Sequence, residues 1–270
     1  MNKGKLIARG RTAEVYEWRE GEVLKLFYDW CPADWPKQEA FIAQAINHKG
    51  LAAPKYIETV TVDGRNGIVY ERVFGVSMLS LMSKNPLQTK RQAKLLAEIH
   101  SKINSRTGES LPNMKASLGR SISKCVFLSD KMRAKVLLIL AELKDANSLC
   151  HFDLHPDQVL ISKDGPVVLD WMTAFQGNRA ADVARTLVLL QYGEAPHMNW
   201  IMRQAVNLVR SAFSRAYLKR YLELCTDVRL LEIKRWMIPV AAARLNDGIK
   251  GEERAILLYL ERQMAKNEGA

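Results

Sequence analysis

The sequence predicts an α+β protein in two parts, a small antiparallel β-sheet lobe with one helix and a larger, mostly helical lobe. Residues 1–75 carry short runs of β-forming residues between turn signals, whereas from about residue 77 onward apolar residues recur at helical spacing. The shift near Phe74-Gly75 is therefore the expected boundary, which gives lobes of residues 1–75 and 76–270. A chain of 270 residues is long enough to bury a substantial core.

About five strands are expected in the first lobe, with one helix after the third strand. Turns are indicated at Gly10, at Glu20-Gly21 and at Asp63-Gly64, the last a hairpin signal. The predicted elements, in order, are strands at 6–8, 15–18 and 23–27, a helix at 36–46, and strands at 56–62 and 68–73.

The second lobe should be helical apart from one pair of strands. Apolar stripes at helical spacing predict helices at 87–103, 130–144, 180–191, 200–224, 228–245 and about 252–264. The exception is a hairpin formed by Val159–Ile161 and Val167–Leu169 around the turn Lys163-Asp-Gly165. Polar loops flank this hairpin on both sides.

Composition narrows the functional class only slightly. The net charge is +11, but basic residues are interleaved with acidic ones and form no block of five or more, so a nucleic-acid partner is disfavoured. The four cysteines have no metal-ligand spacing and suggest reduced thiols. No signal-peptide core and no run of eighteen apolar residues is found, so we expect a cytoplasmic protein without a membrane partner.

Two carboxylates flank the predicted hairpin. Asp153 lies in the loop His151-Phe-Asp-Leu-His-Pro-Asp-Gln158, and Asp170 follows the second strand seventeen positions later. One carboxylate before a strand and another just after the next is an arrangement suited to phosphoryl transfer, in which one steers a hydroxyl proton and the other holds Mg²⁺ on a nucleotide. The pattern therefore indicates a kinase of some kind.

The first lobe supplies residues that suit a nucleotide. Lys25 is a lone charge in the apolar strand Val-Leu-Lys-Leu-Phe, so it must be paired or functional. Glu39 on the following helix is its candidate partner and would hold it on the phosphates. The turn before the second strand contains only one glycine, Gly10, but the backbone N–H groups of Gly10, Arg11 and Thr12 suit a cover for the β- and γ-phosphates.

Together these residues resemble the aminoglycoside phosphotransferase and choline kinase-like superfamily, small-molecule kinases with the two-lobed protein-kinase-like fold. The catalytic segment from His151 to Gln158, with Asp170-Trp171, carries the strongest likeness. Other stretches that match this family are Glu14–Trp18, Val23–Lys25, Glu39, Glu71–Gly75, Leu96–His100 and Gly177–Asp182. The likeness spans most of the chain, and the final seventy residues or so are the least specific part.

The resemblance implies a role for each matching position. Asp153 would be the catalytic aspartate that orients or deprotonates the acceptor hydroxyl, and Asp170 would bind Mg²⁺. Lys25, held by Glu39, would contact the α- and β-phosphates of ATP or GTP. The backbone from Glu71 to Val73 would meet the nucleotide base.

The resemblance also implies structural roles for residues around the catalytic segment. His151 and His155 would anchor its loop, and Asp182 would brace that loop from the start of a helix. The acceptor would be a small molecule with a hydroxyl group.

Gln158 departs from the family pattern, which has asparagine five positions after the catalytic aspartate as a second metal ligand. Both amide oxygens are hard donors suited to Mg²⁺, but glutamine is one methylene longer, so the loop must shift to keep a metal–oxygen distance of about 2.1 Å. We predict that Gln158 still coordinates the metal. The alternative is one tight metal and weakened turnover.

Other functions explain less of the sequence. A protein kinase is disfavoured because only about ten residues separate Asp170 from the next helix, and neither Asp-Phe-Gly nor Ala-Pro-Glu is found. A pseudokinase that binds nucleotide without turnover is favoured by Gln158 and the glycine-poor first turn. Retention of Lys25, Glu39, Asp153 and Asp170 argues against it.

The acceptor is not readable from the sequence. Residues 191–270 hold thirteen Lys and Arg against nine Asp and Glu, which disfavours a strongly cationic acceptor such as an aminoglycoside. A choline-like acceptor would need an aromatic cage, for which Trp171, Trp200, Tyr217 and Trp236 are candidates, although core packing is the commoner role for such residues.

Overall fold

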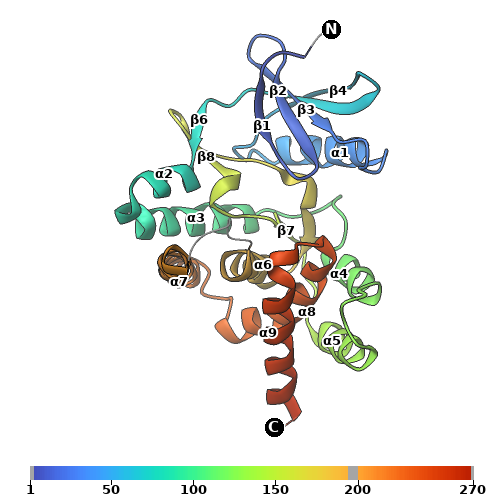
Figure 1. The fold of residues 1–270 in the computed structure, drawn as a ribbon, viewed down its shortest axis with the longest axis vertical. Coiled ribbons are helices and arrows are strands. Elements are labelled where there is room, and N and C mark those ends of the chain that lie inside the picture. Colours follow the sequence, from blue (N-terminus) through green and yellow to red (C-terminus); the bar gives the residue numbers. More distant parts are fainter. Residues whose placement is uncertain (1–2, 194–199, 269–270) are drawn as a thin grey trace. The chain divides into compact units, whose positions relative to one another are not determined.

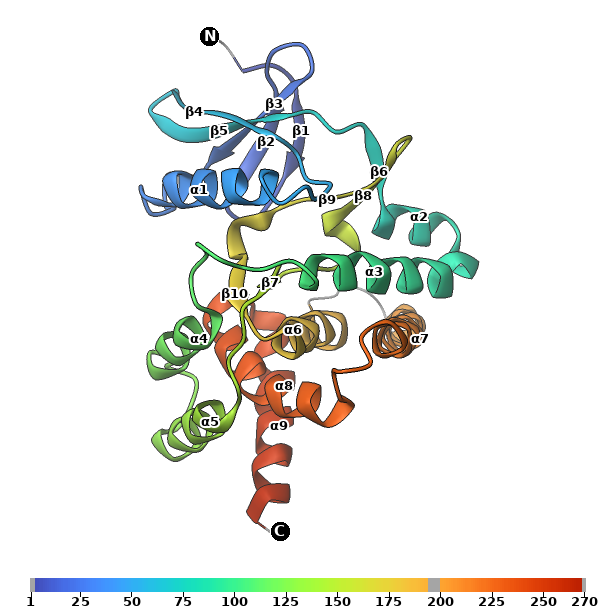
Figure 2. The same ribbon diagram turned by 180° about the vertical axis from the view of Figure 1, so that it is seen from behind.

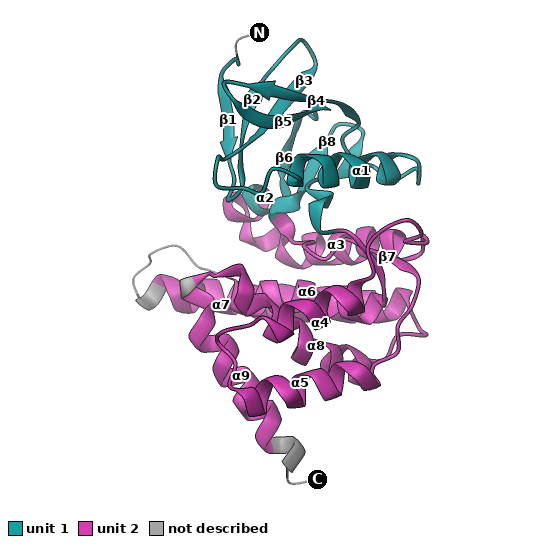
Figure 3. Ribbon diagram, turned by 90° about the vertical axis from the view of Figure 1, so that its right-hand side faces the viewer, with its two compact units in different colours: residues 1–80, 157–173 teal, residues 81–156, 174–270 magenta. Residues whose placement is uncertain are grey.

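A computed structural model describes residues 3–193 and 200–268 of the chain. The chain divides into two compact units, shown in teal and magenta in Figure 3. The first unit comprises residues 1–80 and 157–173, and the second comprises residues 81–156 and 174–270. The hairpin that follows the Asp153 loop therefore groups with the N-terminal residues, although it lies in the middle of the sequence. Each unit is described by itself.

The first unit contains a five-stranded antiparallel sheet in the order β1-β2-β3-β5-β4. Its strands are β1 (Leu6–Arg9), β2 (Ala13–Glu17), β3 (Glu22–Phe27), β4 (Tyr56–Val62) and β5 (Arg65–Glu71). A single helix, α1 (Trp35–Asn47), follows the third strand. This confirms the antiparallel sheet with one inserted helix that was expected from the sequence.

Alternation along the strands gives this sheet two buried faces. Leu24 and Leu26 of β3 pack with Val69 on one face, while Phe27 and Ile68 pack on the other face. Helix α1 lies along the second face, as Figure 1 shows, and contributes buried residues to it. Lys25 alternates with Leu24 and Leu26, so its side chain belongs to the face that α1 covers.

The β4–β5 hairpin is tighter than predicted. The strand expected at 68–73 begins at Arg65 and ends at Glu71, and Val62 pairs directly with Arg65. The reason lies in the turn, because Asp63 (φ 52°) and Gly64 (φ 78°) both adopt the left-handed conformation of a two-residue hairpin turn.

A second, three-stranded sheet completes the first unit. Strand β6 (Gly75–Ser77) pairs with β8 (Val159–Ser162), which pairs with β9 (Gly165–Val168), in an antiparallel arrangement. The hairpin predicted around residues 159–169 is confirmed. After β9 the chain enters a short 3₁₀ turn, η3 (Trp171–Thr173), whose Met172 packs against the α1-covered face of the large sheet. The hairpin thus delivers Asp170 to that face.

The second unit is almost entirely helical (Figure 2). Its helices are α3 (Thr89–Asn104), α4 (Met114–Ser123), α5 (Asp130–Glu142), α6 (Arg179–Tyr192), α7 (Trp200–Leu224), α8 (Leu230–Arg244) and α9 (Lys250–Glu268). A small sheet joins β7 (Ser148–Cys150) to β10 (Phe175–Gly177), and helix α2 (Met78–Lys84) precedes α3 in the chain. Further 3₁₀ turns of this unit are η1 (Pro86–Gln88) and η4 (Leu245–Asp247), whereas η2 (Pro156–Gln158) begins in the second unit and ends in the first.

Helix α6 is the most deeply buried helix in the second unit that the structure describes. Its buried positions run around the whole helix and include Ala181, Asp182 and Arg185 beside the apolar residues. A charged side chain in such a helix must find partners, which is the origin of the polar networks described below. Among residues 3–193 and 200–268, no helix is long and apolar enough to cross a membrane.

Candidate active site

Lys25 is the centre of a charged cluster in the first unit. It lies on β3, the middle strand of the five-stranded sheet, and its Nζ is 2.9 Å from both carboxylate oxygens of Glu39 on α1. The same Nζ is 3.0 Å from Oδ1 of Asp170. The structure thus brings together three residues that the sequence had singled out, from positions 14 and 145 apart in the chain.

Burial and charge act against each other in this cluster. Burial alone lowers the pKa of Lys25, but the carboxylates of Asp170 and Glu39 outweigh it and raise that pKa above its ordinary value. Lys25 is therefore a fixed cation. Burial raises the pKa of Glu39, whereas the charge of Lys25 opposes that rise. Glu39 is 4% exposed and Asp170 is 39% exposed, so Asp170 is the partner that solvent or a ligand can reach.

Tyr70 is a further member of the cluster. Its hydroxyl donates a 2.8 Å hydrogen bond to Oε1 of Glu39 from the neighbouring strand β5. Burial and the adjacent Glu39 carboxylate raise the pKa of Tyr70 well above its ordinary value, so the hydroxyl stays protonated and remains a donor. Glu39 is thereby held from two strands at once.

The backbone of Asp170 is unusual. Asp170 has a φ of 55°, a left-handed conformation that is uncommon for a residue other than glycine. The next residue, Trp171, is buried, and its indole N–H donates a 3.0 Å hydrogen bond to the carbonyl of Val168. The indole ties the turn back onto β9 and so holds Asp170 in a conformation of the kind found at functional sites.

Gln158 directly precedes the first strand of the β8–β9 hairpin, and Asp170 lies shortly after the second strand. Val159 pairs with Val168, and the backbone N–H of Leu169 donates a 2.8 Å hydrogen bond to the carbonyl of Gln158. The half-buried amide of Gln158 and the carboxylate of Asp170 are hard oxygen donors of the kind that Mg²⁺ prefers. Within the described ranges, no group of three or more His, Cys, Asp and Glu residues is arranged to hold a metal.

The first turn is held by its own backbone. The N–H of Gly10 donates a 2.8 Å hydrogen bond to the carbonyl of Ala13, so this N–H serves the turn itself. Arg11 is exposed and Thr12 is half-buried, and the Thr12 carbonyl accepts from the N–H of Tyr28 at 3.0 Å. Of the predicted residues Gly10, Arg11 and Thr12, Gly10 therefore uses its backbone N–H within the turn.

The residues predicted to meet the nucleotide base, Glu71 to Val73, lie at the end of β5 and just after it. Glu71 ends that strand, and its N–H donates a 2.9 Å hydrogen bond to the carbonyl of Lys55. Arg72 in turn donates its N–H to Gly21, while Val73 is half-buried in the connection to β6. The backbone of Glu71 and Arg72 is therefore fixed by hydrogen bonds to neighbouring segments of the first unit.

Asp153 belongs to the second unit and lies in the loop between β7 and η2. The loop is fixed by side chains of α6. Asp182 accepts hydrogen bonds from the backbone N–H groups of His151 (2.9 Å) and Phe152 (2.8 Å), and Thr186 donates to the Leu154 carbonyl (2.9 Å). Phe152 has a φ of 63°, so the residue before Asp153 is held in a left-handed conformation.

Asp182 is itself completely buried and surrounded by donors from α3. Nδ2 of Asn104 donates to it at 2.9 Å, and Nε2 of His100 lies 2.9 Å away. Burial alone would raise the pKa of Asp182, but His100, Asn104 and the Phe152 N–H outweigh it and lower that pKa. The bracing role expected for Asp182 is thus visible in its contacts.

Two further groups lie near the Asp153 carboxylate. One guanidinium nitrogen of Arg185 is 3.7 Å from Oδ1, and Nε2 of His155 is 3.9 Å from Oδ2. His151 is buried, and its Nδ1 accepts a 3.2 Å hydrogen bond from the N–H of Asp153. These contacts show both histidines within the loop, His151 as a hydrogen-bonded anchor of the backbone.

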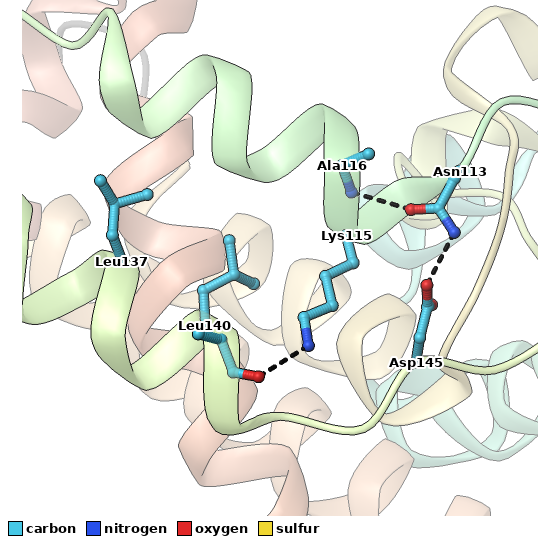
Figure 4. Close-up of a pocket in the computed structure, with 7 residues that line it drawn as sticks. Asn113, Lys115, Ala116, Leu137, Leu140 and Asp145 are labelled. Atoms are coloured by element: carbon cyan, nitrogen blue, oxygen red, sulfur yellow. Dashed lines mark hydrogen bonds between the residues drawn. The ribbon is translucent and has the colours of Figure 1, made fainter.

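A separate hollow in the second unit lies between α4 and α5 (Figure 4). Its polar groups serve the local fold. Lys115 donates to the carbonyls of Ala141 and Leu143 at the end of α5, and Asn113 donates to Asp145 at 2.7 Å while capping α4. The hollow contains none of the predicted site residues.

Sequence reasoning missed Tyr70 and Arg185. Each carried a signal of the same kind, a polar group inside an apolar run, Gly-Ile-Val-Tyr-Glu for Tyr70 and Val-Ala-Arg-Thr-Leu for Arg185. Lys25 lies in an apolar run of the same kind. A buried polar side chain in such a run must be paired, so both positions were open to the same inference.

The fold and the family match together define a phosphotransferase with a kinase-like architecture. The sequence matches the model of the phosphotransferase enzyme family (APH) over residues 4–227. The chain therefore belongs to this family, which confirms the superfamily inferred from its motifs. Comparison with curated protein sequences returned no match.

Solved structures of related enzymes share the fold. An aminoglycoside-3'-phosphotransferase of type VIII is 17% identical, with a TM-score of 0.62 over 88% of this chain and 91% of that one. The aminoglycoside phosphotransferase APH(4)-Ia is 14% identical, with a TM-score of 0.63 over 95% and 89%. The amicoumacin kinase hAmiN, solved with AMP-PNP, Ca²⁺ and Ami, is 14% identical, with a TM-score of 0.60 over 98% and 88%. The predicted α+β, protein-kinase-like fold is confirmed.

Proposed function

We propose that this protein transfers the γ-phosphate of a Mg²⁺-bound nucleoside triphosphate, ATP in the first instance, to a hydroxyl of a small molecule. The observation that carries the proposal is the cluster around Lys25, whose Nζ lies within 3.0 Å of both Glu39 and Asp170. A fixed cation beside a half-exposed carboxylate suits a nucleotide phosphate and its metal ion. Membership of the phosphotransferase family supports the same reaction.

In this proposal residues 1–75 form the nucleotide-binding lobe. Lys25, held by Glu39, binds the α- and β-phosphates, and the turn from Gly10 to Thr12 covers the phosphates that follow. The backbone between Glu71 and Val73 meets the base. GTP belongs in the same test as ATP, because fold relatives were solved with AMP-PNP and with GDP.

Asp170 and Gln158 are the residues that would hold Mg²⁺. The two side chains offer hard oxygens, and the described residues place no larger acidic cluster around them, which suits an ion that completes its shell with phosphate oxygens and water. When bound, the ion would neutralise the charge that develops on the transferred phosphoryl group.

Residues 76–270 form the acceptor lobe in this proposal, and Asp153 is its catalytic residue. A carboxylate oxygen of Asp153 takes the proton of the acceptor hydroxyl, an acid–base contribution of about 10²–10⁴ in rate. The acceptor is a hydroxylated small molecule. A cytoplasmic location, where ATP is abundant, belongs to the same proposal.

The burial of the aromatic residues bears on which acceptor the protein could bind. Trp171, Tyr217 and Trp236 are all buried at 5% exposure or less, and the side chain of Trp200 lies outside the described part. Three of the four candidates for a choline-binding cage are therefore core residues. Relatives of the same fold were solved with kanamycin, hygromycin B and amicoumacin, so such antibiotics belong in the acceptor panel beside metabolites.

The test measures ADP or GDP release from the Mg²⁺ complex of each nucleotide against that panel. Acceptor-dependent release that falls at least about 100-fold in an Asp153→Ala variant is the expected result. Nucleotide binding without release in any combination would instead identify a pseudokinase. A Gln158→Asn variant should change the Mg²⁺ concentration needed for half-maximal rate, and an unchanged requirement would remove Gln158 from the metal site.

A further inference from the structure

The family match ends at residue 227, yet residues beyond it reach the Asp153 loop through a chain of charges. Asp247 of η4 accepts hydrogen bonds at Oδ2 from Arg185 of α6 (2.9 Å) and from Arg244 of α8 (2.7 Å). Arg244 also donates to both carboxylate oxygens of Glu252 on α9, at 2.7 and 2.9 Å. Three helices and η4 are thus joined to one another by alternating charges.

Three members of this chain of charges are buried, and the fourth, Asp247, is 33% exposed at its side chain. Arg185 and Arg244 are each 9% exposed at the side chain and Glu252 is 3% exposed. A two-point contact between a guanidinium and a carboxylate fixes orientation as well as distance. The flanking arginines lower the pKa of Asp247 against the opposing effect of burial, so Asp247 is charged. Glu252 therefore fixes the orientation of the Arg244 side chain. Arg244 and Asp247 together fix the orientation of the Arg185 side chain.

Arg185, the member of this chain of charges next to Asp153, contacts the catalytic loop. Nε of Arg185 donates a 3.1 Å hydrogen bond to the carbonyl of Phe152, and the guanidinium lies 5.5 Å from the centre of the Phe152 ring. Its terminal nitrogen is closer to Asp247 (2.9 Å) than to Asp153 (3.7 Å). Arg185 thereby holds Phe152, the left-handed residue before Asp153, in place, while its shorter ion pair is with Asp247.

Without the Asp247 charge, the nearest carboxylate left to that nitrogen is Asp153. A direct Arg185–Asp153 pair would draw the catalytic carboxylate toward α6 and weaken it as a proton acceptor. It would also compete with the Arg185 hydrogen bond to Phe152, which helps to fix the loop.

We propose that Asp247, set by Arg244 and Glu252, is a positioning residue for the phosphoryl-transfer step. Its carboxylate holds the Arg185 guanidinium on the Phe152 carbonyl and keeps it from pairing fully with Asp153. The proposal rests on the function assigned above, in which Asp153 receives the hydroxyl proton.

The test compares Asp247→Asn with wild type in ADP release from Mg²⁺-ATP, with water as the acceptor. We expect kcat to fall about tenfold while the KM for ATP stays within about twofold, because a displaced catalytic group slows the reaction without changing nucleotide binding. Asp247→Glu restores the charge and should recover part of kcat. Asp227→Asn removes a carboxylate from an exposed pair with Arg179 (2.6 Å) and should leave kcat unchanged.

A double-mutant cycle asks whether Asp247 acts through Arg185. On an Arg185→Met background, Asp247→Asn should lower kcat by less than about twofold. A full tenfold loss on that background would overturn the proposal, and so would wild-type kcat in the single variant. Should Asp247→Asn unfold the protein, Glu252→Gln applies the same test from the outer end of the chain.

Hydrogen exchange separates failure of this proposal from failure of the assigned function. The amide of Asp153 should exchange faster in Asp247→Asn than in wild type, while amides in the middle of α3 keep their rates. Faster exchange in a protein that never releases ADP would preserve the positioning role and reject the kinase function. Unchanged exchange beside normal wild-type turnover would reject the positioning role alone.

Discussion

Two buried carboxylates, Glu39 in the first unit and Asp182 in the second, are satisfied in opposite ways. The partners of Glu39 are side chains, the ammonium of Lys25 and the hydroxyl of Tyr70. Asp182 instead accepts two backbone N–H groups, from His151 and Phe152, beside its side-chain neighbours on α3. Burial raises the pKa of Glu39, whereas the donors around Asp182 outweigh burial and lower its pKa.

The difference indicates that the charges of Glu39 and Lys25 are held for a ligand, whereas the charge of Asp182 is held for the fold. Lys25 shares its ammonium between buried Glu39 and half-exposed Asp170, so an incoming phosphate or metal can take over one of the two contacts. The backbone amides on Asp182 cannot be exchanged without opening the Asp153 loop. Substitutions in the first cluster should therefore cost activity, and substitutions in the second should cost stability.

The largest expected effect is on stability, in Asp182→Asn. The variant keeps the size of the side chain but removes its charge and turns an amide N–H₂ toward existing donors. Breaking a buried, fully bonded charge in this way costs about 3–5 kcal/mol, measured as the change in unfolding free energy in urea. Asp130→Asn, at a side chain that is 99% exposed on α5, should change it by less than about 0.5 kcal/mol. A loss below about 1 kcal/mol in Asp182→Asn would contradict the structural role.

The same carboxylate should make the wild type sensitive to acid. Because the pKa of Asp182 is lower in the folded protein than its ordinary value of 3.8, its contribution to stability is present above that value. The contribution is lost as the pH falls through the lowered folded-state pKa. Between about pH 5 and pH 2, the unfolding free energy should thus decline more steeply in wild type than in Asp182→Asn.

The next effect is on activity, in Lys25→Met. In the proposed function Lys25 binds the nucleotide phosphates, so loss of its charge should reduce kcat/KM by about 10²–10³. Stability should fall by less than in Asp182→Asn, because Glu39 can take up a proton, its pKa being raised already by burial. The variant should then lose stability as the pH rises through that raised pKa. A protein that unfolds as readily as Asp182→Asn at pH 6 would show that Lys25 serves the fold.

Local patterns accounted for the parts of the molecule that depend on neighbours in sequence. Turn residues and apolar alternation predicted the β8–β9 hairpin, and a lone cation in an apolar strand predicted that Lys25 is paired. Asp63 and Gly64 marked a turn, but the sequence does not show that both residues take positive φ, so β5 was placed too late.

The remaining features depend on contacts between distant segments. Strands β7 and β10 are three residues each and exist because Leu149 pairs with Gln176. No periodicity can appear in so short a run. Helix α4 is different, because its buried residues Met114, Leu118 and Ile122 recur at helical spacing and the helix was open to prediction from the sequence. The contact of Lys25 with Asp170 and that of Arg185 with Asp247 span 145 and 62 positions. Only packing decides which carboxylate such a cation meets.

The smallest expected effect is in Tyr70→Phe, which removes a single hydroxyl from Glu39 and leaves Lys25 in place. A buried carboxylate that loses one of its donors should cost about 1–2 kcal/mol of unfolding free energy, and weaker fixing of Glu39 should lower kcat/KM a few-fold. Tyr56→Phe is the matched control, because the Tyr56 hydroxyl contacts Thr59 at the surface of the same sheet (3.1 Å). That control should stay within about 0.5 kcal/mol. If Tyr70→Phe instead reduced kcat/KM as strongly as Lys25→Met, the hydroxyl itself would be acting on the nucleotide.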